Sequence, residues 1–158
     1  MTEQQLERYI HLFKGTVFRL AYSYVKNRED AEDITQDAFV RLYTADTVFE
    51  REDNAKAWLI RVTINLSRDM LRSGWHKRRA ELNDNIPVET AEEGFLLESV
   101  KKLKPEYAAV IYLYYYEGYS LNEIAQLRST NPATVRTRLA RARAQLRKML
   151  SKEEHYES

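Results

Sequence analysis

The sequence predicts an all-helical protein built from two small domains that are joined by a flexible linker. Three observations support this fold class. Only 4 glycines and 3 prolines occur in 158 residues, apolar residues recur at spacings of three and four, and one polar stretch interrupts that periodicity. An all-β or βαβ fold needs many turn residues and glycine-rich connections, so the scarcity of glycine and proline favours long helices.

The polar stretch divides the chain into a first domain at residues 1–72, a linker at 73–94 and a second domain at 95–158. The linker opens with basic residues, turns acidic, and carries three of the seven glycine and proline residues of the chain. This composition is typical of a connection between domains. Residues 81–98 hold six acids and no basic residue, which disfavours incidental contact with DNA.

Three helices are expected in the first domain. Apolar residues follow helical spacing over 6–24 and 31–42, and Asn27 is a suitable N-cap for the second run. A third apolar run, 58–70, follows the cap-type pair Asp-Asn at 53–54. Helices of this length form a small bundle.

The second domain contains a predicted helix-turn-helix. Ser120 and Glu123 form a capping box, in which each side chain accepts a hydrogen bond from the backbone N–H of the other residue. Asn131 and Pro132 then open the next helix as its N-cap and first residue. Two helices joined by so short a turn cross steeply, which is the geometry of DNA-binding helix-turn-helix motifs. The tyrosine-rich run at 112–116 is interpreted mostly as buried core.

The helix that begins at Pro132 has the composition of a DNA-reading helix. Between residues 125 and 150 there are seven basic residues and no acid. Apolar residues occupy one arc of its helical wheel, while small and basic residues occupy the opposite arc, so the helix axis can approach DNA while arginines reach phosphates or guanine edges. The alternative is an Ala/Arg-rich helix with a solvated face. The capped partner helix and the tight turn favour DNA binding.

The net charge of +1 conceals a segregation of charge along the chain. Residues 1–72 carry −1, residues 73–98 carry −3 and residues 99–158 carry +5. A chain-wide charge near zero speaks against nucleic-acid binding, but an excess of +5 on the helix-turn-helix half favours it.

Composition excludes several classes of protein. The chain has no cysteine, which removes disulfides, thiolate metal sites and cysteine nucleophiles. No apolar run is long enough to span a membrane and the N-terminus lacks the pattern of a signal peptide, so we expect a cytoplasmic protein without direct membrane insertion. His11, His76 and His155 are scattered and no glycine-rich phosphate loop occurs, so no enzyme, metal site or cofactor is expected.

Three segments resemble the extracytoplasmic-function (ECF) group of bacterial RNA polymerase sigma factors. EGYSLNEIAQLRSTNPATVRTRLARARAQLRKML, at 117–150, is similar to the promoter-reading helix-turn-helix of that family. REDAEDITQDAFVRLY, at 28–43, resembles its core-binding helix, and AWLIRVTINLSRDMLR, at 57–72, resembles its promoter-melting segment. The sequence departs from the family in the turn, where Ala133 stands in place of a common glycine.

The resemblance implies roles for three groups of residues. The group that falls where the family docks on the clamp of core RNA polymerase is Asp33, Gln36, Asp37 and Phe39. The group that falls where the family captures and melts the −10 promoter element is Phe49, Arg61, Asn65, Arg68 and Arg72, the last four of which form a basic and amide face suited to an opened strand. The group expected to contact the −35 element is Thr134, Arg136, Thr137, Arg138, Arg141 and Arg143.

The expected function is therefore that of a sigma factor, which directs core RNA polymerase to specific promoters and promotes DNA melting at the start of transcription. Core RNA polymerase, promoter DNA and an anti-sigma factor are the expected partners. The alternative is a stand-alone helix-turn-helix regulator whose N-terminal bundle dimerises or senses a ligand. Only the regulator should bind specific duplex DNA strongly without core polymerase.

Overall fold

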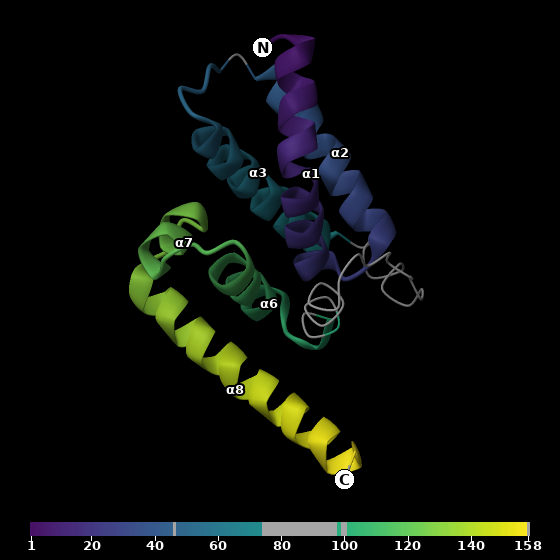
Figure 1. Ribbon diagram of the computed structural model, residues 1–158, viewed down its shortest axis with the longest axis vertical. Coiled ribbons are helices and arrows are strands. Elements are labelled where there is room, and N and C mark those ends of the chain that lie inside the picture. Colours follow the sequence, from purple (N-terminus) through teal and green to yellow (C-terminus); the bar gives the residue numbers. More distant parts are fainter. Residues whose placement is uncertain (46, 74–97, 99–100, 158) are drawn as a thin grey trace. The chain divides into compact units, whose positions relative to one another are not determined.

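The computed structural model describes residues 1–45, 47–73, 98 and 101–157, and all its regular elements are helices (Figure 1). The chain divides into two compact units, the N-terminal unit Met1–Pro87 and the C-terminal unit Val88–Ser158. An all-helical architecture was predicted and is confirmed. The predicted linker, apart from Ser73, lies outside the described residues. The elements are α1 (Glu3–Val25), α2 (Arg28–Thr44), α3 (Glu52–Arg72), α6 (Pro105–Ile111), the π-helical turn η1 (Tyr112–Tyr116), α7 (Leu121–Leu127) and α8 (Pro132–Glu157).

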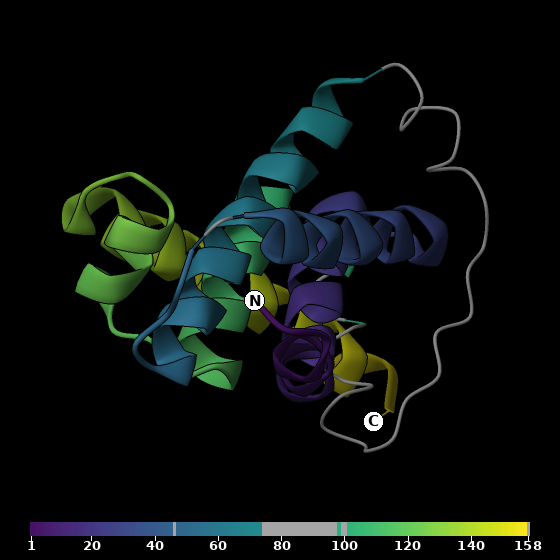
Figure 2. The same ribbon diagram turned by 90° about the horizontal axis from the view of Figure 1, so that it is seen from above.

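The N-terminal unit is a three-helix bundle in which α1, α2 and α3 each pack against the other two (Figures 1 and 2). Its core contains side chains from all three helices, including Phe13, Val17, Leu42 and Leu59. These residues belong to the apolar runs that predicted the helices, because residues spaced by three and four share one face of a helix.

Helices α1 and α2 begin with side-chain caps, whereas the start of α3 differs from the prediction. Asn27 caps α2 as predicted, since its Oδ1 accepts a hydrogen bond of 2.9 Å from the backbone N–H of Asp30. The predicted caps of α3 at 53–54 are wrong, because α3 begins at Glu52 and its N-cap, Arg51, makes no side-chain cap. Acidic side chains inside the first turn stabilise this end of α3 through the helix dipole. Helix α1 begins with a capping box at Thr2 that sequence reasoning missed.

Raising the pH from about 8 to about 10 is expected to stabilise the N-terminal unit through Lys26, because burial lowers the pKa of this side chain from 10.5 to about 8. Over this range the unfolded chain holds a proton on Lys26 that the folded chain has released, so stability rises with pH. The full shift corresponds to about 3 kcal/mol, but solvent reaches the half-buried side chain and reduces the expected gain to about 1 kcal/mol. Urea unfolding at several pH values measures this gain. Lys26→Gln should lack it, and an unchanged pH dependence in that variant would contradict the assignment.

The C-terminal unit packs α8 against α6 and α7, and its core includes Leu113, Ile124, Val135 and Leu139. Ser120 and Glu123 form the predicted capping box, with hydrogen bonds of 3.0 and 3.1 Å. The hydrogen bond from the backbone of Ser120 lowers the pKa of the Glu123 carboxyl. The steep pair of α7 and α8 confirms the helix-turn-helix (Figure 1).

Most of the tyrosines at 112–116 lie closer to solvent than predicted. Only Tyr112 is fully buried among them, whereas Tyr115 and Tyr116 are 53% and 43% exposed. The interpretation of this run as mostly core was wrong, because the chain forms a π-helical turn here and not a continued α-helix. A wider turn places successive side chains at different angles from those of an α-helix.

The turn between α7 and α8 contains a serine in the left-handed conformation, with φ of 54° at Ser129. An L-residue pays about 1–2 kcal/mol for this conformation, which glycine adopts freely. Ser129→Gly is therefore expected to raise the free energy of unfolding of the C-terminal unit by about 1 kcal/mol, after the greater freedom of glycine in the unfolded chain is subtracted. Thermal unfolding measures the change. Ser129→Ala keeps the Cβ atom and should give no such gain, so equal stability of the two variants would contradict the explanation.

Candidate nucleic-acid interface

Helix α8 presents a small and basic face to solvent. Its opposite, core-facing side buries Val135, Leu139 and Ala142. The exposed face is smooth because three of its residues are alanines, and it is positively charged. Its members are Ala133, Thr137, Ala140, Arg141, Ala144 and Lys148, all of them exposed. An α-helix with this surface fits the major groove of DNA, where short side chains permit close approach.

The structure separates the predicted −35 contacts into exposed residues and residues held by other side chains. Arg136, Thr137 and Arg141 are exposed, and within the described residues the two arginines make no ion pair. Thr134 is half-buried at the start of α8, where its backbone N–H and hydroxyl both donate to Oδ1 of Asn131, at 2.9 and 3.1 Å. This confirms Asn131 as the cap of α8.

Arg138 faces a carboxylate of α6. Its Nη1 lies 3.7 Å from Oε2 of Glu106, and its side chain is 29% exposed. The same carboxylate pairs with Arg128, whose side chain is completely buried and whose Nη1 donates a 3.0 Å hydrogen bond to the backbone carbonyl of Glu106. Arg128 and Glu106 therefore connect the turn of the helix-turn-helix to the start of α6.

Sequence reasoning missed the roles of Arg128 and Glu106. A signal for Arg128 was present, because it follows Ile124 by four residues and so continues the buried face of α7. No local pattern identifies Glu106 as its partner, since the two residues are 22 positions apart.

Arg143 is held on the other flank of α8 by tyrosines of η1. Its Nε donates a hydrogen bond to the hydroxyl of Tyr115, and its guanidinium carbon lies 5.7 and 5.4 Å from the ring centroids of Tyr114 and Tyr115. This is the geometry of a cation–π interaction. Arg143 therefore helps to join α8 to η1.

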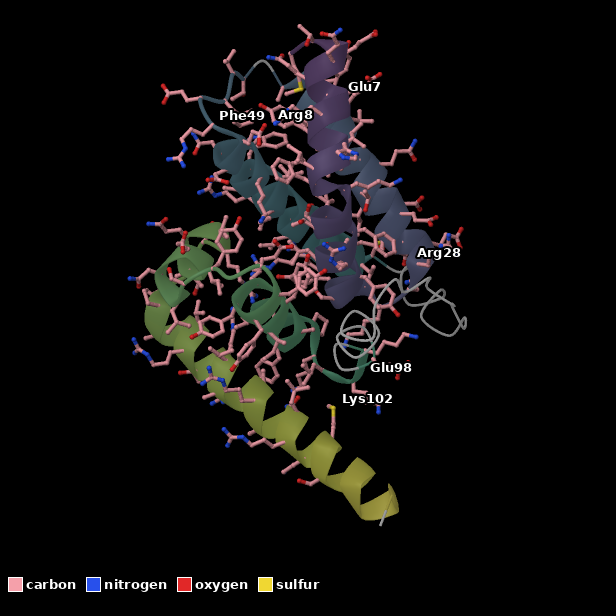
Figure 3. The ribbon with its side chains drawn as sticks, in the orientation of Figure 1. Glu7, Arg8, Arg28, Phe49, Glu98 and Lys102 are labelled. Carbon is pink, nitrogen blue, oxygen red and sulfur yellow. The ribbon has the colours of Figure 1, made fainter. Side chains whose placement is uncertain are left out.

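Phe49, the predicted −10 contact in the segment before α3, belongs to an aromatic cluster (Figure 3). Its ring centroid lies 6.3 Å from that of Tyr9 and 6.1 Å from that of Trp58, both in edge-to-face geometry. Next to this cluster, Nε of Arg8 donates a 2.6 Å hydrogen bond to Glu52 and ties the start of α1 to the start of α3. The segment that carries Phe49 is thus anchored from both helices.

The predicted polar face of α3 is formed. Arg61 and Asn65 are exposed, and Arg68 is half-buried. Arg72 pairs with Asp69 across one turn, with Nη2 to Oδ1 at 2.7 Å. Arg61, Asn65, Arg68 and Arg72 step by threes and fours and therefore share one side of the helix.

The four predicted polymerase contacts on α2 have different environments. Asp33, Gln36 and Asp37 are exposed, and Oδ1 of Asp37 lies 3.3 Å from Nε of Arg41. Phe39 is only 7% exposed and packs in the core of the bundle. Of the neighbouring acids, Asp30 is fully buried against Asn27, to which its Oδ2 is joined at 2.8 Å.

An apolar groove of about 520 Å³ lies between α1 and α2, beside the exposed polar residues. Gln36 lines it, together with the exposed apolar side chains of Val40 and Tyr43, which are 54% and 43% exposed. Apolar side chains of α1 form the opposite wall, namely Leu6, Ile10 and Phe18. Exposed apolar surface rimmed by polar residues is typical of a protein-binding site.

The described part of the chain contains no helix that is long and apolar enough to cross a membrane. In the same residues, no three or more His, Asp or Glu side chains converge on a possible metal position.

Two family models match the chain, one in each unit. The Sigma-70 region 2 model matches residues 9–77, and the Sigma-70, region 4 model matches residues 96–146. Together they cover most of the sequence in the order in which the two segments were predicted.

Curated relatives agree with the two models. RNA polymerase sigma factor SigV of Bacillus subtilis is 30% identical over 149 residues, which cover 89% of this chain and 88% of SigV. The ECF RNA polymerase sigma factor SigE of Mycolicibacterium smegmatis is 34% identical over 149 residues, which cover 86% of this chain but only 58% of SigE.

A solved structure shares the fold. It is the sigma factor RpoE from Bartonella quintana, crystallised in complex with the anti-sigma factor NepR. The two chains are 22% identical and superpose with a TM-score of 0.73 over 94% of this chain and 98% of the other.

Proposed function

Because this chain belongs to the ECF group of RNA polymerase sigma factors, we propose that its N-terminal unit docks on core polymerase and holds the −10 element while its C-terminal unit reads the −35 element. As a sigma factor it acts in promoter recognition and transcription initiation, and the family is not enzymatic. Membership of this family decides against the stand-alone regulator. The observation that carries the division of labour is the order of the two matched regions, each of which lies within one unit.

The proposed −35 reader is the exposed face of α8. Arg136, Thr137 and Arg141 supply donors that can reach base edges or phosphates, and Thr134 stands at the N-terminal end of the helix, which enters the groove in helix-turn-helix proteins. The cap formed by Asn131 fixes the direction of this first turn. Charge supports the proposal, because this half of the chain carries +5.

Arg136→Ala is expected to relax discrimination at one base of the −35 element by about 1–3 kcal/mol, because a bidentate arginine–guanine contact is lost. The measurement is competition between promoters that differ at single −35 positions, with polymerase reconstituted with wild-type or variant chain. Arg147→Ala is the matched control, because Arg147 is also an exposed arginine of α8 but lies 11 residues further from the N-terminal end of the helix. An equal loss on every sequence would mean that Arg136 contacts a phosphate.

The proposed −10 reader combines α3 with the anchored Phe49. Arg61, Arg68 and Arg72 can track the phosphates of an opened strand, and Asn65 can hydrogen-bond a base edge. The aromatic cluster supports this assignment, because Tyr9 and Trp58 hold the Phe49 ring beside the start of α3. Opening DNA costs about 1.4 kcal/mol per base-pair step, so binding energy from both promoter elements and from the polymerase is needed.

The proposed polymerase-docking surface consists of Asp33, Gln36 and Asp37 with the adjacent apolar groove. Charged residues beside exposed apolar side chains combine steering with buried contact area, which is the usual composition of a protein interface. Phe39 acts from the floor of this surface, since it lines the groove and is nearly buried. We further propose an anti-sigma factor as a second protein partner and the cytoplasm as the place of action, where core polymerase works.

Run-off transcription with core polymerase tests the whole proposal. Adding the chain to core enzyme should produce transcripts from a limited set of genomic templates, and neither component alone should produce them. Specific duplex binding by the isolated chain should be weak. The absence of any promoter-directed transcript would reject the proposed division of labour.

A further inference from the structure

We infer that Glu106 is a positioning residue that keeps Arg138 away from DNA and thereby lowers the sequence-independent affinity of the C-terminal unit for duplex DNA. The inference rests on the proposed function, because it takes α8 as the DNA-reading helix.

One carboxylate serves two arginines of the helix-turn-helix. Arg128, in the turn, is completely buried, pairs with the Glu106 carboxylate and also donates to the Glu106 backbone carbonyl. Arg138, on α8, places Nη1 3.7 Å from Oε2 of the same carboxylate. The Glu106 side chain is 37% exposed, but Arg128 pairs with its carboxylate and donates to its backbone carbonyl, so the negative charge is held beside Arg138.

Arg138 lies beside a carboxylate, unlike the two exposed arginines of α8 that are proposed to contact DNA. Its side chain is mostly buried, whereas Arg136 and Arg141 are exposed and make no ion pair within the described residues. To neutralise a phosphate, Arg138 would have to give up its attraction to Glu106. Arg136 and Arg141 lose no such interaction within the described part of the unit.

The consequence concerns the number of phosphates that α8 neutralises. Each lysine or arginine that neutralises a phosphate releases counterions and adds about 0.9 to the slope of log affinity against log salt. Holding Arg138 on Glu106 removes one such contact. A promoter-specific subunit gains from this, because non-specific DNA competes with its promoters for binding.

The test is the salt dependence of binding by the full chain to a fluorescein-labelled DNA duplex of mixed sequence, followed by fluorescence anisotropy between about 50 and 200 mM salt. Arg141→Gln should reduce the slope by about 0.9, as expected for a phosphate contact. Arg138→Gln should reduce it by well under half of that amount. Glu106→Gln should steepen the slope by about 0.9 and tighten binding roughly eight-fold at about 0.1 M salt, and the gain should vanish in the double variant Glu106→Gln/Arg138→Gln.

The outcomes separate this inference from the proposed function. A slope in Arg138→Gln that falls as far as that of Arg141→Gln would overturn the inference, as would an unchanged slope in a Glu106→Gln chain that is folded by circular dichroism. If Glu106→Gln unfolds the unit, the comparison of Arg138→Gln with Arg141→Gln decides alone. An unchanged salt slope in Arg141→Gln would reject α8 as the DNA-reading helix and the inference with it. Failure of the whole proposed function would appear separately, as an absence of promoter-directed run-off transcripts.

Discussion

Replacing Glu106 with alanine is expected to lower the free energy of unfolding of the C-terminal unit by about 3–5 kcal/mol, because the buried guanidinium of Arg128 loses its countercharge. The Arg128 side chain is completely buried whereas its partner Glu106 is 37% exposed, so the alanine variant leaves a buried positive charge that only water entering at the vacated position can solvate. Arg138 adds a second positive charge near the same point. Loss of one partner of a buried ion pair is among the few single changes that destabilise a small unit this strongly.

The double variant Glu106→Ala/Arg128→Leu is the control for this prediction. It removes the buried charge together with its partner, and a buried ion pair can be exchanged for apolar side chains at little cost. The double variant should therefore recover most of the lost stability. Hydrogen exchange of the α7 and α8 amides measures the effect in the C-terminal unit. Tryptophan fluorescence reports on the N-terminal unit, because both tryptophans, Trp58 and Trp75, belong to it, and this signal should not change. Equal destabilisation by the single and double variants would contradict the explanation.

The double variant Asp33→Arg/Gln36→Ala is expected to lose its association with core polymerase while its fold stays intact. Both side chains are exposed on α2 beside the apolar groove, so the substitutions leave the core of the bundle unchanged. Reversing a charge at a complementary interface costs about 2–5 kcal/mol of binding free energy. Co-purification with core enzyme, followed by titration of fluorescently labelled chain, measures the loss.

Glu29→Arg provides the matched control for this docking prediction. Glu29 is an exposed acid on the same helix, outside the groove and outside the predicted contacts, so the variant makes the same change of charge elsewhere on α2. Its affinity for core polymerase should stay close to that of the wild-type chain. Retained co-purification of Asp33→Arg/Gln36→Ala would discredit the docking site, and equal losses in both variants would point to long-range charge and not to a local contact.

The helices and most of their ends were predictable because their causes are local. The caps at Asn27 and Asn131 and the capping box at Ser120 depend on groups within three residues of one another. The predicted start of α3 was wrong because the two cap-type residues at 53–54 lie inside the first turn of the helix and not before it. The prediction that most of the tyrosines at 112–116 are buried was also wrong. It assumed the side-chain spacing of an α-helix, whereas the backbone forms a π-helical turn there.

The sequence by itself determined the all-helical class, the helix-turn-helix, the basic helix α8 and the family. The reason is that apolar periodicity, helix capping and clusters of like charge all depend on residues that are close together in the sequence. Only the tertiary structure decided which basic and acidic side chains are available to a partner. Glu106 meets Arg128 across 22 positions and Tyr115 meets Arg143 across 28, and folding alone brings such pairs together. The basic stretch therefore resolves into one buried arginine, two arginines held by α6 and η1, and a set of exposed basic side chains.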